Sequence, residues 1–387
     1  MPSEHGVHEG SGVYIRNIHQ LKSALARVHE IGLFKVLSDN GYLTHCLTAN
    51  PLISPNYGFD FDFYRSYDAR GDSTRTSHYL ANDQSRLANA IAILRKRRVH
   101  LLLKLVYYDQ LRRNANRILG HPPLEKGSKY IIRALKKIKL KEPFFLFINL
   151  MEAHPPYSWS ERPSRSIQFD SIFQRECRHE RFWSTCYKMH ADLAIRRCLE
   201  IIEQIEKYNH NSITIVTSDH GQLLGESGRY DHGFFLDKAL VKVPLYVRLP
   251  NEAKLELAPE AIVSLTEIPR LIGDVIANKA AFLGSDLAVA ESFGPIWDFT
   301  EMNRVGAVPP ASSSLNSHRM KIVSKTGEVI YNLDTKSFEE KQGVIPKTLL
   351  DSCISGFFNH PITAEIDSSD SSDEQVLLDR LKQLGYE

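Results

Sequence analysis

The segment formed by residues 213–250 constrains the fold of this chain more than any other. A β-branched apolar run at residues 213–217 ends in the polar tetrapeptide 218–221 (Ser-Asp-His-Gly), and a second apolar run follows at residues 244–247. A strand, a polar turn and another strand are typical of α/β proteins, in which ligands bind at the carboxyl ends of parallel strands. The segment therefore predicts a sheet that ends in a polar site.

Four residues of this segment have side chains or backbone freedom suited to metal binding. Asp219 and His220 are adjacent, and both side chain types bind metal ions. Gly221 lets the backbone turn sharply beside them. His232 follows and also precedes a glycine. The alternative interpretation is a capped turn with histidines that have only structural roles, and these residues alone leave both open.

Two earlier predicted strands are also followed by polar residues. The short buried strand predicted at residues 44–48 is followed by Asn50, and the apolar run 143–150 is followed by His154. Helical periodicity at residues 18–40 and 187–208 separates the expected strands. Residues 65–140 are strongly charged, which favours helix. The alternation predicts an α/β fold with a mainly parallel sheet flanked by helices.

The sequence changes character after residue 310. Residues 312–314 are three serines, which indicate a linker, and residues 318–333 predict a hairpin. The acidic Ser/Asp tract 366–374 is expected to be a loop, and a short helix is expected at 376–386. We expect an α/β domain at residues 1–310 and a small, β-rich α+β subdomain at residues 311–387.

Composition excludes several classes of protein. The chain has 48 Lys and Arg against 46 Asp and Glu, a net charge of +2, which does not indicate a nucleic-acid partner. Its five cysteines form no CxxC pair, which argues against a disulfide framework or a structural zinc site and favours a reducing compartment. We see no signal peptide and no apolar run near the ~20 residues of a transmembrane helix. These features predict a cytoplasmic protein and leave its oligomeric state open.

Several short motifs occur in order along the chain. They are Gly41-Tyr42, Ala49-Asn50-Pro51, Tyr57-Gly58-Phe59-Asp60, residues 145–157 (FLFINLMEAHPPY), Ser218-Asp219-His220-Gly221, Leu224-Gly225-Glu226, His232-Gly233, Val243-Pro244-Leu245, and Arg319-Met320-Lys321 with Tyr331-Asn332-Leu333. In this order they resemble the sulfatase family of the alkaline phosphatase superfamily.

The resemblance implies a role for each candidate residue. Asp219 and His220 would be ligands of a divalent metal ion, usually Ca²⁺ in this family, with Mg²⁺, Mn²⁺ or Zn²⁺ as alternatives. His154 and His232 would be catalytic residues near the transferred group or the leaving oxygen. Asn50 would contact an oxygen of the substrate. That substrate would be a small anionic ester, of the sulfated sugar or aryl sulfate class.

The sequence departs from the family pattern at its nucleophile. The family uses a Cys or Ser, processed to formylglycine, in a Cys/Ser-x-Pro-x-Arg segment, and this chain contains no such segment. Residues 1–6 (MPSEHG) resemble the end of a motif that follows the nucleophile. We therefore expect the formylglycine and an Asp-Asp pair of metal ligands upstream of Met1, and no turnover by the chain as written.

Three hypotheses follow from this pattern. The first is a sulfate ester hydrolase that is truncated at its N-terminus. The second is a non-catalytic protein that keeps the sulfatase fold. The third is a related chemistry of the superfamily, such as phosphoester or phosphonate hydrolysis or phosphoethanolamine transfer.

Overall fold

A computed structural model describes most of the expected elements of the chain. It describes residues 33–50, 53–55, 59, 61–68, 71–72, 124–155, 157, 180–208, 211–233, 235–250, 253–257, 261–292, 312–315 and 317–359. The chain divides into two compact units. Unit 1 comprises Met1–Asp39, Gln168–Glu176 and Asn211–Asp367, and unit 2 comprises Asn40–Ile167, Cys177–His210 and Ser368–Glu387. No helix among the described residues has the length and apolar character needed to cross a membrane.

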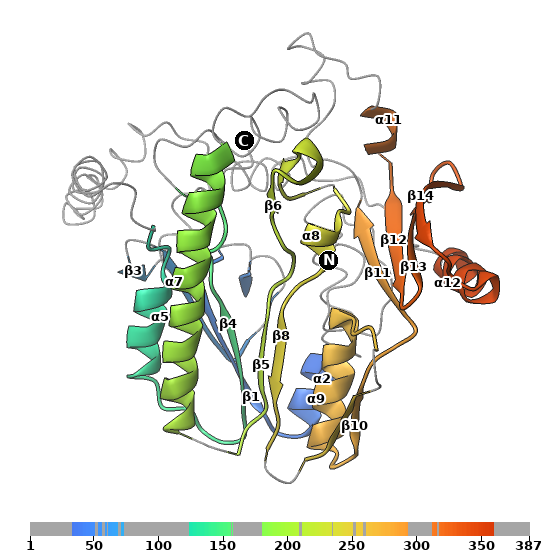
Figure 1. Cartoon of the computed structure of the whole chain (residues 1–387). Coiled ribbons are helices and arrows are strands. Elements are labelled where there is room, and N and C mark those ends of the chain that lie inside the picture. Colours follow the sequence, from blue (N-terminus) through green and yellow to red (C-terminus); the bar gives the residue numbers. More distant parts are fainter. Residues whose placement is uncertain are drawn as a thin grey trace, which may run out of the picture. The chain divides into compact units, whose positions relative to one another are not determined.

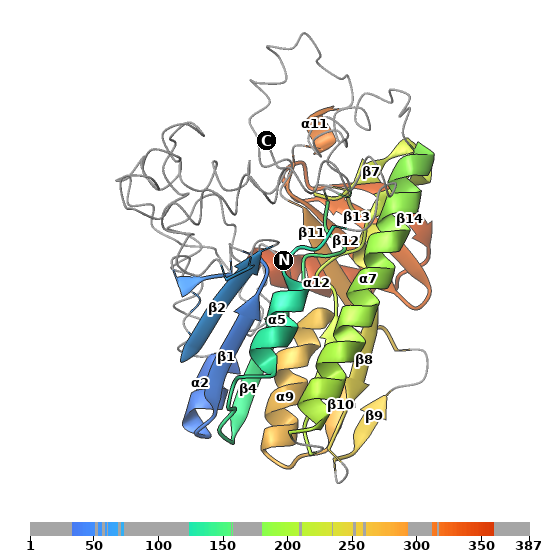
Figure 2. The same ribbon diagram turned by 90° about the vertical axis from the view of Figure 1, so that its left-hand side faces the viewer.

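Unit 2 is built around a four-stranded sheet with the strand order β3-β2-β1-β4. β1 pairs in parallel with both β2 and β4 (Figure 2). β3 is antiparallel to β2. The strands are β1 (Leu43–Thr48), β2 (Phe63–Asp68), β3 (Gly71–Asp72) and β4 (Phe144–Asn149).

Two helices, α5 (Ser128–Leu135) and α7 (Glu180–Glu206), lie side by side in unit 2 (Figure 1). The buried positions of α5 recur at helical spacing, so one face of the helix is apolar. That face packs with strand residues such as Leu47 and Tyr67 and with Ile201 of α7 in a shared core. Burial of this core holds the ends of β1 and β4 at one edge of the sheet.

Unit 1 contains the candidate site residues Asp219, His220 and His232. Two short antiparallel pairs, β5 with β8 and β6 with β7, flank these residues, and helix α9 packs against β10. Its elements up to residue 283 are α2 (Leu33–Asp39), β5 (Thr214–Thr217), β6 (Leu223–Leu224), η2 (Glu226–Gly228), β7 (Tyr230–Asp231), α8 (Lys238–Val241), β8 (Leu245–Arg248), β9 (Leu255–Leu257), η3 (Leu265–Glu267), α9 (Ile268–Ile276) and β10 (Ala281–Leu283).

The remaining part of unit 1 is an antiparallel sheet with the order β11-β12-β13-β14. One face of this sheet is apolar and packs against α12, with Met320, Ile322, Val329 and Tyr331 in the core. The elements are β11 (Leu287–Ser292), α11 (Ser312–Leu315), β12 (Arg319–Ser324), β13 (Gly327–Asn332), β14 (Ser337–Gly343) and α12 (Lys347–Asn359). The expected hairpin at 318–333 is thus present as β12 and β13. The expected domain boundary after residue 310 stays a prediction.

Three local predictions differ from the structure. β8 runs antiparallel to β5. A parallel pair would need a connection that returns the chain to the start of β5. The connection here contains the β6–β7 hairpin and the four-residue α8, and a helix about 6 Å long is too short for that return. Phe63–Asp68 is a strand where helix was favoured for residues 65–140, because it pairs with β1. Ser312–Leu315 is a helical turn, because Leu315 packs on a core that includes Leu223.

Other expected elements lie outside the described residues. These are most of the helix expected at 18–40, the acidic tract 366–374 and the helix expected at 376–386. The strands expected at 44–48, 143–150, 213–217 and 244–247 and the helix expected at 187–208 are present as β1, β4, β5, β8 and α7.

Candidate metal-binding and catalytic site

A tight turn after β5 carries Asp219 and His220. The backbone N–H of Gly221 donates to the carbonyl oxygen of Leu240 at 2.8 Å. A Cβ atom at Gly221 would collide with the carbonyl oxygen of Ala239, so only glycine fits at this point. The glycine therefore lets α8 pack directly against the turn that presents the two candidate ligands.

The hydrogen bonds of His220 define its protonation. Its Nδ1 lies 2.8 Å from the carbonyl oxygen of Gly221, which can only accept, so Nδ1 carries the proton. Burial and the neighbouring His232 lower the pKa of His220, and Asp219 only partly opposes them. The neutral ring then has its lone pair on Nε2, 3.8 Å from Oδ2 of Asp219. This is the form of histidine that binds metals.

Asp219 has an ionised carboxylate that is open to solvent, with 80% of its side chain exposed. Surrounding protein raises the pKa of this carboxyl by desolvation, but the His220 ring and the backbone N–H of His220 lower it by more. That N–H donates to Oδ1 of Asp219 at 3.0 Å. The net lowering of the pKa keeps Asp219 charged at neutral pH, as a metal ligand requires.

His232 is buried and is held by two neighbouring side chains. Its Nδ1 lies 2.7 Å from Oδ1 of Asp231 and 3.0 Å from Oε1 of Gln222, and Gln222 also donates to Asp231 at 3.0 Å. Both contacts of Nδ1 are to acceptor oxygens, so Nδ1 carries a proton. The ring stacks on His220 with centroids 4.4 Å apart. Unit 1 therefore brings Asp219, His220 and His232 together.

Asn50 and His154 lie at the ends of adjacent parallel strands in unit 2. Asn50 follows β1, and its backbone N–H donates to Thr48 Oγ1 at 2.9 Å. His154 lies in the turn after β4, where its backbone N–H donates to the carbonyl oxygen of Met151 at 3.1 Å. Its Nδ1 donates to the carbonyl oxygen of Pro155 at 2.6 Å. Because Thr48 lies opposite Asn149, β1 and β4 end side by side, and Asn50 and His154 follow the carboxyl ends of these two strands.

A buried carboxyl group, Glu152, joins the His154 turn to the start of α5. Glu152 Oε1 accepts the backbone N–H groups of Lys126 (3.2 Å) and Ser128 (3.0 Å). The ammonium of Lys126 donates to the carbonyl oxygens of Glu152 and His154. Burial raises the pKa of Glu152, and the hydrogen bonds with Ser128 only partly offset that rise. No pattern in the sequence indicates this role, because Glu152 and Ser128 are far apart in the chain.

The described cysteines with shifted pKa values are not activated nucleophiles. Burial raises the pKa of Cys46 to about 12. Burial also raises the pKa of Cys198. A catalytic thiolate needs the opposite shift. Both cysteines are free thiols.

Comparison with known proteins identifies the family. The family model described as Sulfatase matches residues 26–268, more than half of the chain. The chain belongs to the sulfatase family. No curated protein sequence matches it.

Solved structures resemble this sulfatase-family chain at low identity. A 2-O GAG sulfatase has a TM-score of 0.51 and 8% identity, over 88% of this chain and 78% of that one. A Bacteroides thetaiotaomicron protein assigned as a sulfatase has a TM-score of 0.49 and 9% identity over the same shares. A phosphonate monoester hydrolase from Silicibacter pomeroyi has a TM-score of 0.42 and 11% identity, over 88% and 81%. The first of these confirms the α/β sulfatase fold.

The donor set fits part of a metal site. Asp219 supplies a charged carboxylate and His220 supplies a neutral imidazole with its lone pair on Nε2. Among the described residues no group of three or more His, Cys, Asp or Glu side chains is arranged to hold a metal ion. Ca²⁺ prefers six to eight oxygen ligands, whereas imidazole suits Zn²⁺ and other transition metals. The pair is therefore chemically suited to a divalent ion and would need further ligands.

The position of Asp231 and Gln222 beside His232 was not predicted. Asp231 directly precedes His232 in the sequence, but adjacent side chains do not ordinarily contact each other. Here Asp231 has φ of +70°, in the left-handed region, and this local conformation lets its carboxylate reach the ring of the next residue. Gln222 reaches the same ring because β6 and β7 pair as a hairpin, with Leu223 opposite Asp231.

Proposed function

We propose that this sulfatase-family protein takes part in the hydrolysis of sulfate esters at a site that uses a divalent metal ion. The observation that carries the proposal is the group of Asp219, His220 and His232. It combines an ionised carboxylate, a neutral imidazole and a second histidine whose ring is fixed by Asp231. Ester hydrolysis needs charge neutralisation at the transferred group and an acid for the leaving oxygen.

In this proposal Asp219 and His220 would hold the ion, through the carboxylate and Nε2. When bound, the ion would neutralise charge on the oxygens of the ester. Asp231 accepts from Nδ1 of His232 and so leaves Nε2 as the atom that exchanges a proton. His154 has the same tautomer, with Nδ1 bonded to Pro155, and its Nε2 would meet the substrate. Asn50 would donate to an ester oxygen.

The nucleophile of the active form is proposed to be a formylglycine encoded upstream of Met1. Residues 1–387 contain no Cys/Ser-x-Pro-x-Arg segment, and the buried Cys46 is a poor nucleophile. Ca²⁺ is the metal that we propose first, because of the family, with Mg²⁺, Mn²⁺ and Zn²⁺ as alternatives. The proposed substrate is a small anionic ester. One structural neighbour is a 2-O GAG sulfatase, which favours a sulfated sugar.

Two proteins should be compared to test this proposal: residues 1–387, and the form extended by the reading frame upstream of Met1. We expect sulfate release from 4-methylumbelliferyl sulfate by the extended form only. Asp219→Asn in that form should lose both the activity and the metal measured by elemental analysis. Asp286→Asn changes an exposed carboxylate of the same unit and is the matched control, which should keep both.

Retention of the metal by Asp219→Asn would reject the assignment of the ligand. The same assay with 4-nitrophenyl phenylphosphonate distinguishes sulfate ester hydrolysis from phosphonate ester hydrolysis, since a phosphonate hydrolase would prefer that ester. If the extended form hydrolyses neither ester although it binds metal, the non-catalytic hypothesis replaces the proposal.

A further inference from the structure

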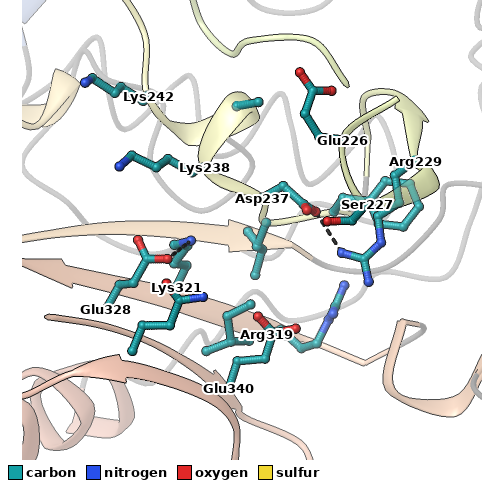
Figure 3. A pocket seen from close by; sticks show the side chains of 15 residues that line it. Glu226, Ser227, Arg229, Asp237, Lys238, Lys242, Arg319, Lys321, Glu328 and Glu340 are labelled. Carbon is teal, nitrogen blue, oxygen red and sulfur yellow. Dashed lines mark hydrogen bonds and ion pairs between the residues drawn. The ribbon is translucent and has the colours of Figure 1, made fainter. Parts of the chain in front are cut away.

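A cavity of about 630 Å³ lies within unit 1, and neither Asp219 nor His220 is among its lining residues. Its floor is one face of the sheet of β12, β13 and β14, and its other walls are the segment 226–229 and the start of α8 (Figure 3). Its lining residues are Glu226, Ser227, Arg229, Phe235, Leu236, Asp237, Lys238, Ala239, Lys242, Arg319, Lys321, Glu328, Ile330, Glu340 and Gln342. A cavity of this size accommodates a small organic ligand.

The floor of this cavity is charged, in contrast to the opposite face of the same sheet. Alternate residues of β12 point to opposite faces, so Met320 and Ile322 enter the apolar core while Arg319 and Lys321 face the cavity. Lys321, Ile330 and Glu340 form one row across the three strands. One sheet thus has an apolar face for packing and a polar face toward a cavity.

The charged floor is rigid because its cations are buried and paired. Arg319 and Lys321 each have only 4% of their surface exposed. Lys321 pairs with Glu328 at 3.0 Å, and Arg319 pairs with Glu339 at 3.5 Å. Burial lowers the pKa of Arg319, and Glu339 partly opposes that shift. Buried charges held by partners give a polar wall whose donors are fixed in position.

The rim of the cavity has its positive charge at one end. Lys238 and Lys242 are exposed, are four residues apart, and lie together in Figure 3, whereas Glu226 and Ser227 lie at the other end. Arg229 pairs with Asp237 at 2.9 Å and so adds little net charge. A ligand that fits this arrangement has an anionic group at one end and hydroxyl groups at the other.

We propose that this cavity binds a sugar that carries a single sulfate group, at a site separate from the metal-binding turn. Lys238 and Lys242 pair with the sulfate, and the Glu226 carboxylate and the Ser227 hydroxyl, at the other end of the rim, accept from or donate to the hydroxyl groups of the ring. The choice of sulfate over another anion rests on the proposed function. Because Gly221 donates to Leu240 of α8, the same short helix joins this cavity to the turn of His220.

Isothermal titration calorimetry in EDTA tests the proposal on the 387-residue chain. The probes are N-acetylglucosamine 6-sulfate, N-acetylglucosamine and inorganic sulfate. We expect binding of the sulfated sugar, and binding about tenfold weaker in the double variant Lys238→Gln/Lys242→Gln, since charge-assisted bonds are lost. The matched control Lys254→Gln/Lys279→Gln removes two exposed lysines of the same unit that do not line the cavity, and it should leave the affinity unchanged.

A second variant separates this site from the proposed metal site. Asp219→Asn should bind the sulfated sugar normally in EDTA, whatever its effect on metal binding or hydrolysis. Equal affinity for inorganic sulfate would overturn the sugar site, because the hydroxyl contacts would then contribute nothing. Absence of binding, equal weakening in the control, or loss in Asp219→Asn would also overturn it.

Discussion

At the scale of single residues, hydrogen bonds to Nδ1 give three histidines the same tautomer. His154, His220 and His232 each have Nδ1 bonded to an oxygen that accepts, from Pro155, Gly221 and Asp231 respectively. In this tautomer the lone pair of the ring is on Nε2. His190 also carries its proton on Nδ1, which donates to the carbonyl oxygen of Cys186. Its Nε2 accepts the backbone N–H of Leu124, so both nitrogens are used by the backbone and the role of His190 is structural.

Asp231→Asn tests how the ring of His232 is held. Asparagine tolerates the left-handed backbone of this position but lacks the carboxylate that accepts from Nδ1. We expect part of the population to change to the Nε2-protonated tautomer, visible in long-range ¹H–¹⁵N spectra of the ring. The control Asp237→Asn changes a carboxylate that pairs with Arg229 and should leave the His232 signals in place. Unchanged signals in Asp231→Asn would show that Gln222 alone orients the ring.

His45 is a buried residue with a pH-dependent effect on stability. It is 8% exposed, and its ring nitrogens lack a hydrogen-bond partner within the described part of the chain. Burial lowers its pKa below the usual value of 6.5, and Asp62 only partly opposes this. The folded state then binds fewer protons than the unfolded state, so stability is full above pH 6.5 and falls as the pH decreases through 6.5 toward the lowered pKa.

We expect His45→Leu to stabilise the protein by about 1 kcal/mol at about pH 7.5, because an unsatisfied buried polar group is removed. The gain should be larger at about pH 5.5, where the wild type loses stability. Urea unfolding at the two pH values measures it, with His318→Leu as a control that breaks the bond to Glu291 and should destabilise. An equal gain at both pH values would mean that His45 does not titrate as stated.

At the scale of elements, close packing of α8 against the turn after β5 positions the candidate ligands. The carbonyl oxygen of Ala239 occupies the space that a side chain at Gly221 would need. The position of His220 therefore depends on a contact between a strand end and a short helix that begins at Lys238. A change at Gly221 should disturb stability and metal binding together.

Gly221→Ala is expected to destabilise unit 1 by about 2–3 kcal/mol, since overpacking forces the backbone apart. Gly273→Ala in α9 is the matched control: a Cβ atom at this position would meet nothing within 4 Å, and a helical alanine should stabilise by about 0.5–1 kcal/mol. Thermal unfolding of both variants provides the comparison. Equal stability of Gly221→Ala and the wild type would contradict the close contact between Gly221 and α8.

At the scale of the whole molecule, an ion held by Asp219 and His220 would stabilise only the folded state. Binding at a concentration about one hundred times the dissociation constant adds about 2.7 kcal/mol. We expect Ca²⁺ or Mn²⁺ to raise the melting temperature of the extended form defined above, because the pair needs further ligands, and we expect EDTA to reverse the change. In that form Asp219→Asn should respond to neither, whereas Asp286→Asn should behave as the unmodified protein. An equal response of Asp219→Asn would place the ion elsewhere.

The sequence alone predicted that polar candidate residues follow β1, β4 and β5, because a strand followed by polar residues is a local pattern. It also predicted the family and the α/β class. Only the tertiary structure placed Gln222 and Asp231 on His232, and Glu152 on the start of α5. It also decided that β8 pairs antiparallel with β5 and that Arg319 and Lys321 face a cavity. The physical reason is that these contacts join residues whose separation in the sequence carries no periodic signal, so pairing of strands and packing of helices had to be known first.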